Sequence, residues 1–456
     1  MTAAVDEAPL TLDQAPPKTL GALDQGAFWA NLGVSLLGFS GALLLLDPLG
    51  GAPLGIGAAV LAAVVGSLIG TAMVGLAAVP GARTGAPAMV LLRGLFGARL
   101  SYVPTVLNIV QMFGWGAFEL WVIATGAQAI FGDAVPYQIW VVAAGALTVG
   151  LTIRPLGMIR LLRRFVTAGV VVAMIWLTVA LVRQAPSLGT GSWTAFAPAV
   201  DYVIALSVSW VPVAADYARH SRSGRAAFGG VVTGYTIAQV ACLVLGILAL
   251  ALVGNDPGRV WEAFVAVPLG GLFFGVLVLR ETDQSFANVY STAMSLQNLM
   301  PRVDRRVLSV AVGALTTVIA LFADVNSYGA FLGVIGAVFV PMFAVLAVDY
   351  FLLGGSARWD TSAAAPARWV MIVPWVLGFV AYWLVTAVPT LDPWDAWWAT
   401  VRESVGFERQ PWMNAALAAF LVAALVTLVT RFLPGGAAAP SRRDPRRTSR
   451  DDPAPR

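Results

Sequence analysis

The sequence predicts an all-α integral membrane protein of about twelve transmembrane helices. Three observations lead to this fold class. Apolar residues make up 59% of the 456 residues and charged residues only 11%, whereas a soluble domain carries roughly 25% charged residues. The apolar residues form long runs separated by short polar loops. The arginines in those loops alternate from side to side, which is typical of a chain that crosses a bilayer repeatedly.

The chain divides into two polar tails and one hydrophobic domain. Residues 1–22 lack the apolar run of a signal peptide, so we expect a disordered cytoplasmic tail. Residues 434–456 are basic and Pro-rich and predict a second disordered tail. The transmembrane domain is expected over residues 23–433. Each span needs roughly 20 helical residues, and the expected spans lie near 27–47, 55–79, 101–131, 137–153, 164–183, 197–218, 229–253, 268–297, 307–324, 328–353, 368–389 and 412–432.

The arginines predict the orientation of these spans. If the N-terminus is cytoplasmic, the loops on that side carry fifteen arginines, which are Arg83, Arg93, Arg99, Arg154, Arg160, Arg163, Arg164, Arg219, Arg222, Arg225, Arg302, Arg305, Arg306, Arg358 and Arg368. The opposite loops carry four, which are Arg183, Arg259, Arg402 and Arg409. Positive residues concentrate in cytoplasmic loops. We therefore expect a multi-pass protein of the inner or plasma membrane with both termini in the cytoplasm.

The first and sixth spans contain residues that interrupt helices. Gly33, Gly38 and Gly41 lie in the first, and Pro212 lies in the sixth. Proline cannot donate a backbone hydrogen bond and clashes with the preceding turn, so the sixth helix should kink or unwind there. Interrupted helices five positions apart are typical of an inverted five-plus-five repeat with a binding site at the membrane midplane. Glycine and proline also permit simple close packing, and the pattern leaves both interpretations open.

The third span places polar and aromatic residues on one helical face, namely Asn108, Gln111, Trp115 and Glu119. Polar groups at membrane depth must be satisfied by protein or by a water-filled cavity, so they are candidates for a functional site. A flat ligand could stack on the Trp115 indole while bonding to Glu119. The alternative is a polar stripe that satisfies neighbouring helices.

The eighth span carries three formal charges, Arg280, Glu281 and Asp283, in its middle. Such charges must pair or face water. Arg280 can pair with Glu281, Asp283 or Glu119 in a structural role, whereas a carboxylate without a partner could carry a coupling proton. The sequence does not separate these roles.

Several motifs resemble the nucleobase:cation symporter-1 family, whose members include cytosine, purine, allantoin and hydantoin permeases. The most specific is the segment from Gly81 to Arg93, GARTGAPAMVLLR, followed by Phe96-Gly97. Further matches are Asn31-Leu32, Gly114-Trp115-Gly116, Ser209-Trp210, Asp216-Tyr217-Ala218-Arg219, Asn288-Val289-Tyr290-Ser291 and Asp349-Tyr350. The resemblance spans roughly residues 20 to 435, and the purine–cytosine permease branch is the most similar.

The resemblance implies a LeuT-like fold, with repeat one over about 27–183, repeat two over about 197–353 and two accessory helices over about 368–432. It implies a substrate sandwiched between Trp115 and Trp210. The further substrate contacts that it implies are Glu119, Gln284, Asn288 and Ser35. In sodium-coupled relatives the cation lies between the first-helix break and helix eight, which here means Gly38, Leu279, Thr282 and Asp283.

Three residues depart from the family pattern. Glu119 replaces a neutral amide, and an ionised carboxylate only accepts hydrogen bonds, which favours a donor-rich or cationic ring. Asp283 stands where a hydroxyl would help to coordinate sodium, and it suits proton coupling at least as well. Gln284 replaces a usual asparagine. These changes leave open which heterocycle is the substrate.

The expected function is secondary active import of a nucleobase by a symporter, coupled to protons or sodium through alternating access. The alternative within transport is a vitamin-like or cationic heterocycle of pyridine or thiazolium type. An enzyme would need a convergent nucleophile–base or metal set, and a channel would need a repeated filter-like segment; the sequence contains neither. The lone His220, expected to be a solvated loop residue, predicts no metal site apart from sodium. We expect no cofactor and no nucleic-acid partner, and a monomer that works in the lipid bilayer.

Overall fold

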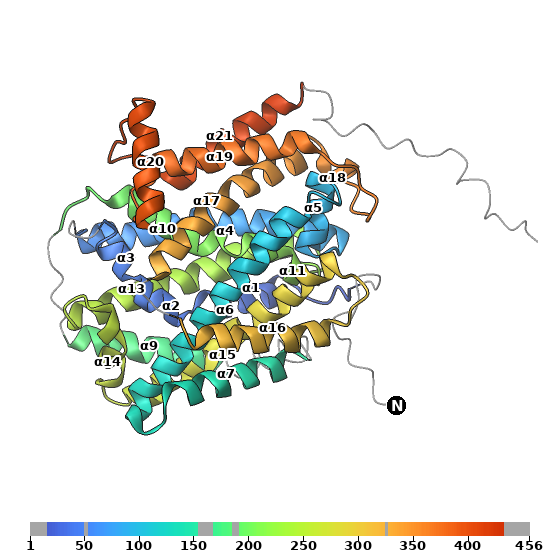
Figure 1. Cartoon of the computed structure of the whole chain (residues 1–456). Coiled ribbons are helices and arrows are strands. Elements are labelled where there is room, and N and C mark those ends of the chain that lie inside the picture. Colours follow the sequence, from blue (N-terminus) through green and yellow to red (C-terminus); the bar gives the residue numbers. More distant parts are fainter. Residues whose placement is uncertain (1–15, 50–52, 154–166, 185–190, 324–326, 433–456) are drawn as a thin grey trace, which may run out of the picture.

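The computed structural model describes residues 16–49, 53–153, 167–184, 191–323 and 327–432. Within these ranges the chain is helical, with two isolated bridges that join Leu20 to Ser221 and Leu54 to Ser192. The long helices lie side by side in one bundle (Figure 1). Most of the two expected tails, and the expected loop arginines between residues 154 and 164, fall outside the described residues.

The helices follow the expected order. The first half contains α1 (Ala22–Gly33), α2 (Leu36–Gly41), α3 (Leu43–Leu46), α4 (Ile56–Thr84), α5 (Ala88–Phe96), α6 (Tyr102–Phe131), α7 (Tyr137–Thr152) and α9 (Thr167–Arg183). The second half contains α10 (Phe196–Val208), α11 (Ala214–Ala218), α12 (Gly224–Gly230), α13 (Thr236–Leu252), α14 (Val260–Val265), α15 (Gly270–Leu299), α16 (Arg305–Ala320) and α17 (Tyr328–Ala347). The last helices are α18 (Gly355–Arg358), α19 (Ile372–Val385), α20 (Asp392–Ser404) and α21 (Ala415–Thr430).

Each expected span coincides with a described helix or with helices that follow one another. Five described helices are long and apolar enough to cross a membrane, or six if α1 and the α2–α3 segment form one bent span. Four shorter apolar helices lie in α7, α9, α19 and α21. The other two expected spans are α15, which carries charges in its middle, and α16, which begins at two arginines. The prediction of an all-α, multi-pass membrane fold is confirmed.

The helices pack in the pairs that a two-fold repeat requires. The first span, through α1, contacts the seventh, which consists of α12 and α13. The equivalent contact joins the sixth span, through α10, to the second, α4. The third and eighth spans, α6 and α15, lie against each other, as do the fourth and ninth, α7 and α16. Exchanging the two halves therefore maps these contacts onto one another, as expected for the repeat. The broken first and sixth spans are consequently held at equivalent places in the bundle.

A close contact between α4 and α10 depends on two glycines. A Cβ atom at Gly66 would lie 2.6 Å from the Val203 Cβ, and one at Gly70 would lie 2.5 Å from the Ser207 Cβ. The two glycines are four residues apart and share one helical face. Small residues at this spacing let membrane helices approach closely. The contact positions α10 directly before its break.

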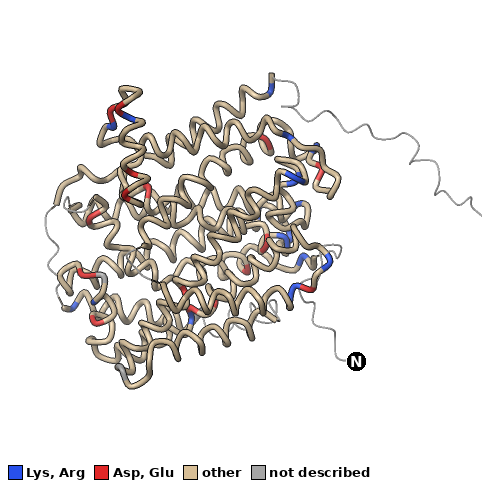
Figure 2. The backbone as a smooth tube through the Cα atoms, viewed as in Figure 1, with Lys and Arg blue, Asp and Glu red and all other residues tan. Residues whose placement is uncertain are grey.

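Basic residues gather at one end of the bundle. Figure 2 shows most of the Lys and Arg positions along the backbone at the end where the first and last described residues lie. Residues of the expected N-terminal tail pack there, since Leu20 N donates to His220 O at 2.9 Å and Lys18 Nζ donates to Ala82 O at 2.8 Å. Ordered structure thus begins before the expected boundary at residue 22.

Two buried carboxylates attach the accessory helices. Asp201 on α10 accepts hydrogen bonds from Ala415 N at 2.7 Å and Ala416 N at 2.8 Å, so it caps the start of α21. Asp349, from the Asp349-Tyr350 motif, forms an ion pair with Arg368 at 2.8 Å just before α19. Carboxylates at helix N-termini are favourable because the backbone N–H groups there have no partners within the helix. The motif at Asp349 is therefore explained by packing rather than by ligand binding.

Candidate functional site

The first broken helix has a defined break. α1 ends at Gly33, Val34 and Ser35 are extended, and α2 begins at Leu36 with a bend of 55°. The Ser35 hydroxyl accepts a hydrogen bond from Leu37 N at 3.2 Å, which makes it the N-cap of α2. The carbonyls at the end of α1 have no partners within the helix. They must be satisfied by other elements.

The second break lies in the sixth span, as Pro212 predicts. α10 ends at Val208, and a short 3₁₀ turn that contains Pro212 leads into α11. The helix is interrupted here because proline has no backbone N–H to donate and its ring clashes with the preceding turn. Gln111 of α6 donates to the freed Ser209 carbonyl at 3.1 Å. The interruption expected from the sequence is confirmed.

A small cavity of about 20 Å³ lies between these breaks. Its lining combines both broken helices with α6, α13 and α15, and consists of Leu32, Gly33, Ser35, Gly38, Trp115, Leu206, Trp210, Tyr235, Gln239, Cys242, Leu243 and Gln284. The volume suffices for about one water molecule. Sites for drug-sized molecules usually measure about 300–1,000 Å³, so a ring enters only after the surrounding helices move apart.

The two predicted tryptophans meet at this cavity. Trp115 and Trp210 are each 7% exposed and contribute to its wall from α6 and from the second break. Trp115 contacts Phe331 and Tyr328 edge to face, with ring centroids 5.3 Å and 6.0 Å apart. Trp210 contacts Trp29 in the same manner at 6.0 Å. Both indoles are thus held by aromatic packing, which leaves their orientation well defined.

Glu119 is buried one turn beyond Trp115, outside the cavity lining itself. No described group donates a well-formed hydrogen bond to either of its oxygens, although the Glu281 carboxyl lies beside it and the Arg280 charge acts on it. Other buried polar atoms also have no hydrogen-bond partner among the described residues, namely Trp115 Nε1, Gln111 Oε1, Asn288 Nδ2 and Tyr328 Oη. Unsatisfied buried polar groups are costly and call for an explanation. Those of Trp115, Gln111 and Asn288 lie on α6 and α15, two of the helices predicted to hold the substrate.

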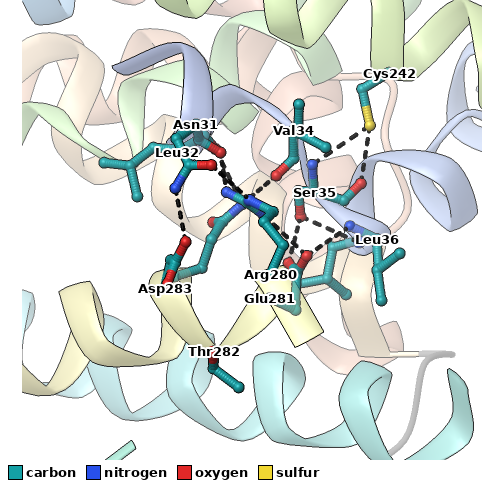
Figure 3. Close-up of polar contacts among 12 residues, drawn as sticks. Asn31, Leu32, Val34, Ser35, Leu36, Cys242, Arg280, Glu281, Thr282 and Asp283 are labelled. Carbon is teal, nitrogen blue, oxygen red and sulfur yellow. Dashed lines mark hydrogen bonds and ion pairs between the residues drawn. The ribbon is translucent and has the colours of Figure 1, made fainter. Parts of the chain in front are cut away.

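Side chains of α15 fill the first break (Figure 3). Arg280 pairs with Glu281 at 3.0 Å and donates to the Asn31 carbonyl. Gln284 donates to the carbonyls of Leu32 and Val34, each at 3.0 Å. The partner of Arg280, which the sequence leaves open, is therefore Glu281. The Gln284 amide hydrogens are engaged by α1 and hold the break.

The residues expected to form a cation site do not converge. Leu279 is 69% exposed, and it lines a lateral groove together with Thr282, whose hydroxyl donates to the Leu279 carbonyl at 2.7 Å. Figure 3 shows Thr282 pointing away from the break. Gly38 lies beside Cys242. Asp283 alone of the four contacts α1 through its side chain, by accepting from Asn31 Nδ2 at 2.8 Å. Successive residues of a helix are about 100° apart, so positions 280 and 284 face the break while 279 and 282 do not.

Sequence reasoning did not assign a role to two residues of this site. Asn31 ties α1 to Asp283, and Cys242 accepts from Ser35 N at 3.4 Å and donates to Ser35 O at 3.0 Å. The sequence did contain a sign for Asn31, because an amide side chain inside an apolar span is a candidate for a functional site. Cys242 gave no signal, because a cysteine in an apolar run usually behaves as a small hydrophobe.

The expectation of a solvated His220 is wrong. The side chain is 3% exposed, and its Nδ1 lies 3.1 Å from the Pro17 carbonyl oxygen, so the neutral ring donates to that oxygen. Burial and the neighbouring Arg219 lower the pKa of His220 to about 4. His220 is thus a docking point for the N-terminal segment.

Acidification from pH 7 to pH 5 is expected to weaken the docking of residues 16–20. Docking buries the His220 ring and so disfavours its protonated form. The undocked state therefore binds more protons below about pH 6.5, and docking should weaken as the pH falls. Hydrogen–deuterium exchange of this segment measures the effect. His220→Gln keeps a donor for Pro17 without titrating, and equal pH dependence in both proteins would contradict this account.

Comparison with known proteins assigns the family. Residues 48–365, more than half of the chain, match the family described as permeases for cytosine/purines, uracil, thiamine and allantoin. The chain belongs to this family. Its members are permeases, in agreement with the expectation that this protein is a transporter and not an enzyme.

Solved structures share the fold of this permease. Mhp1, a nucleobase-cation-symport-1 family transporter in a closed conformation with bromovinylhydantoin bound, matches with a TM-score of 0.74 at 16% identity, covering 95% of this chain and 97% of that chain. Inward-facing Mhp1 matches with 0.68 at 17% identity, covering 94% of each chain. A Na+-coupled sialic acid symporter in an outward-open state matches with 0.63 at 10% identity, covering 93% of this chain and 91% of that chain. No curated protein matches the permease significantly.

Proposed function

We propose that this permease imports a small planar heterocycle, a nucleobase of the cytosine or purine type, by alternating access coupled to a proton or sodium gradient. The observation that carries the proposal is the meeting of Trp115 and Trp210 at a cavity between two broken helices. The family description and the fold shared with cation symporters support the same assignment. Aromatic side chains suit this task because every nucleobase presents a flat π-face.

The proposed binding site divides recognition between rings and polar groups. Trp115 and Trp210 enclose the two faces of the heterocycle, and Ser35 lies at the cavity wall. Asn288 lies one turn beyond Gln284 on α15, and its Nδ2 has no partner among the described residues, so it offers a donor to a ring edge. Gln284 has a different role, because its amide hydrogens donate to the carbonyls of Leu32 and Val34 at the break.

The cavity must enlarge for transport, and the breaks are where this can occur. The half-helices on either side of each break can tilt separately, while their neighbours in the repeat stay packed. Transport against a gradient requires that cation and substrate favour the same conformation, with a coupling typically of about 1–3 kcal/mol. The end of the bundle that is rich in arginine is proposed to face the cytoplasm of the inner or plasma membrane. One chain contains the whole site, so we propose that it works as a monomer.

Uptake measurements test the proposal. Radiolabelled cytosine, adenine, hypoxanthine and uracil are offered to cells that lack their own permeases and express the protein, with and without a protonophore. We expect accumulation of one base above the level of cells without the protein. Absence of accumulation of every base, in cells shown to contain folded protein, contradicts the nucleobase assignment.

A second candidate substrate is a cationic or donor-rich heterocycle, such as the thiazolium-type vitamin that the family description includes. Glu119 favours it, because its buried oxygens lack well-formed hydrogen bonds within the described protein and lie beside a second carboxyl group. A cation or a ring edge with N–H donors would satisfy them. Competition of labelled thiamine uptake by the nucleobases decides between the two candidates.

Glu119→Gln is expected to shift selectivity away from donor-rich rings. A hydrogen bond typically contributes about 0.5–1.5 kcal/mol, so uptake of an aminopyrimidine or a cationic ring should fall by roughly 2- to 12-fold. Uptake of a ring that offers mainly acceptors should not fall, since the new amide also donates. The ratio of the two uptake rates is the measurement. An unchanged ratio would remove Glu119 from the recognition site.

A further inference from the structure

Two carbonyl groups at the end of α1 and one within the break are already satisfied by side chains of α15. Helix α1 stops at Gly33, which leaves its last carbonyls without helical donors. Arg280 donates to the carbonyl of Asn31, and Gln284 donates to those of Leu32 and Val34 at 3.0 Å. A guanidinium and an amide from one turn of α15 therefore cover the break. The guanidinium also supplies the positive charge that the C-terminal end of a helix favours.

The Arg280 side chain is built into the break. The side chains of Arg280 and Glu281 are 0% and 1% exposed, and they form an ion pair at 3.0 Å. Glu281 in turn accepts from Ser35 Oγ and Leu36 N, both at 3.2 Å, at the start of α2. The pair thus bonds to both sides of the break. A buried arginine with this many partners cannot leave its position without exposing several unsatisfied groups.

The residues of the expected sodium site do not fit a sodium ion. The ion would need carbonyl oxygens of α1 together with oxygens of Leu279, Thr282 and Asp283 on α15. Of these three side chains Asp283 alone reaches α1, and its Oδ2 already accepts a hydrogen bond from Asn31 Nδ2 at 2.8 Å. The α1 carbonyls accept from Arg280 and Gln284, and the Thr282 hydroxyl is turned towards the lateral groove and bonded within its own helix.

We infer that the Arg280 guanidinium is the resident cation of the first helix break, so that the permease works without binding sodium there. This inference rests on the proposed transport function and assigns the ion requirement of that same site. Arg280 performs the structural task of joining α1, α2 and α15, and the driving ion must act elsewhere than at these carbonyls.

Sodium replacement tests the inference on the complete protein. The purified full-length permease is reconstituted in liposomes, and uptake of labelled cytosine, adenine, hypoxanthine, uracil and thiamine is compared in sodium chloride and choline chloride at equal pH and membrane potential. We expect equal rates. A sodium-coupled site would lose roughly 5- to 150-fold on sodium removal, and that result would overturn the inference. If none of the five compounds is transported, the proposed function fails while the next measurement still tests the inference.

Thermal unfolding supplies a readout that does not depend on transport. A ligand that binds the folded state raises the unfolding temperature by mass action. We expect the wild-type protein in detergent to unfold at the same temperature in sodium and choline chloride, and a saturable sodium-specific increase would overturn the inference.

Variants of Arg280 examine the resident cation directly. Arg280→Ala is expected to unfold at a lower temperature and to regain part of the difference in low, non-denaturing guanidinium chloride. Arg259→Ala, at an arginine whose side chain is 56% exposed, is the control and should show neither the loss nor the recovery. Arg280→Lys retains a charge and is expected to be intermediate. Wild-type stability of Arg280→Ala would contradict the role assigned to Arg280.

Discussion

Trp115→Ala is expected to reduce substrate uptake by roughly 5- to 150-fold, the effect of about 1–3 kcal/mol that alanine substitution produces when one base loses its aromatic stacking partner. The indole forms part of the cavity wall and is fixed by Phe331 and Tyr328. Uptake of labelled base at concentrations below saturation measures the loss. Trp210→Ala should have an effect of the same order, because it removes the second indole of the cavity wall.

Two further variants separate stacking from folding. Trp115→Phe keeps an aromatic face and is expected to retain most of the uptake. Trp121→Ala removes an indole from the same helix that is only partly buried and is absent from the cavity wall, so its uptake should equal that of the wild type. Wild-type transport by Trp115→Ala, at equal amounts of folded protein, would exclude the sandwich arrangement.

Glu281→Ala is expected to destabilise the protein by about 3–5 kcal/mol, the usual effect of removing one partner of a buried ion pair. The change leaves the Arg280 guanidinium buried without its counter-charge, and it removes the acceptor of Leu36 N and Ser35 Oγ. Unfolding of the detergent-solubilised protein by denaturant measures the difference in free energy.

An exposed ion pair provides the matched control for this prediction. Arg259 and Glu262 pair at 2.8 Å with side chains that are 56% and 57% exposed. Surface pairs contribute about 0–1 kcal/mol, so Glu262→Ala should change stability little. Glu281→Gln preserves an acceptor for Leu36 N and should lie between wild type and Glu281→Ala. Similar effects of Glu262→Ala and Glu281→Ala would show that the buried pair does not hold the break.

The fold could be predicted because its signals are local. Lipid demands long apolar helices, and the proline at position 212 interrupts a helix whatever surrounds it. The spans and the second break were therefore predictable from hydropathy and one residue. The convergence of Trp115 and Trp210 was predicted through the family resemblance, since residues 95 positions apart in the sequence give no direct sign of contact.

The cation residues could not be predicted because their grouping depends on helix rotation. A resemblance assigns residues by position, and Leu279 and Thr282 were placed at the break on that basis. The helix instead presents Arg280 and Gln284 to α1, while Leu279 is exposed. A charged residue next to an expected ion site is the sign that the family pattern has changed there. His220 was misjudged for a similar reason, because its burial depends on residues 16–20, far away in the sequence.

The position of Cys242 gives this protein an intrinsic chemical reporter. It is the only cysteine of the chain, it is buried, and it bonds to Ser35 at the point where the first helix is interrupted. A small alkylating reagent can reach it only when that region opens. We expect alkylation of the unmodified protein, followed by mass spectrometry, to be slow at rest and to change in rate when transported substrate is added. Equal rates with and without transported substrate would contradict movement at this break. The conformational cycle can thus be followed without engineering any residue.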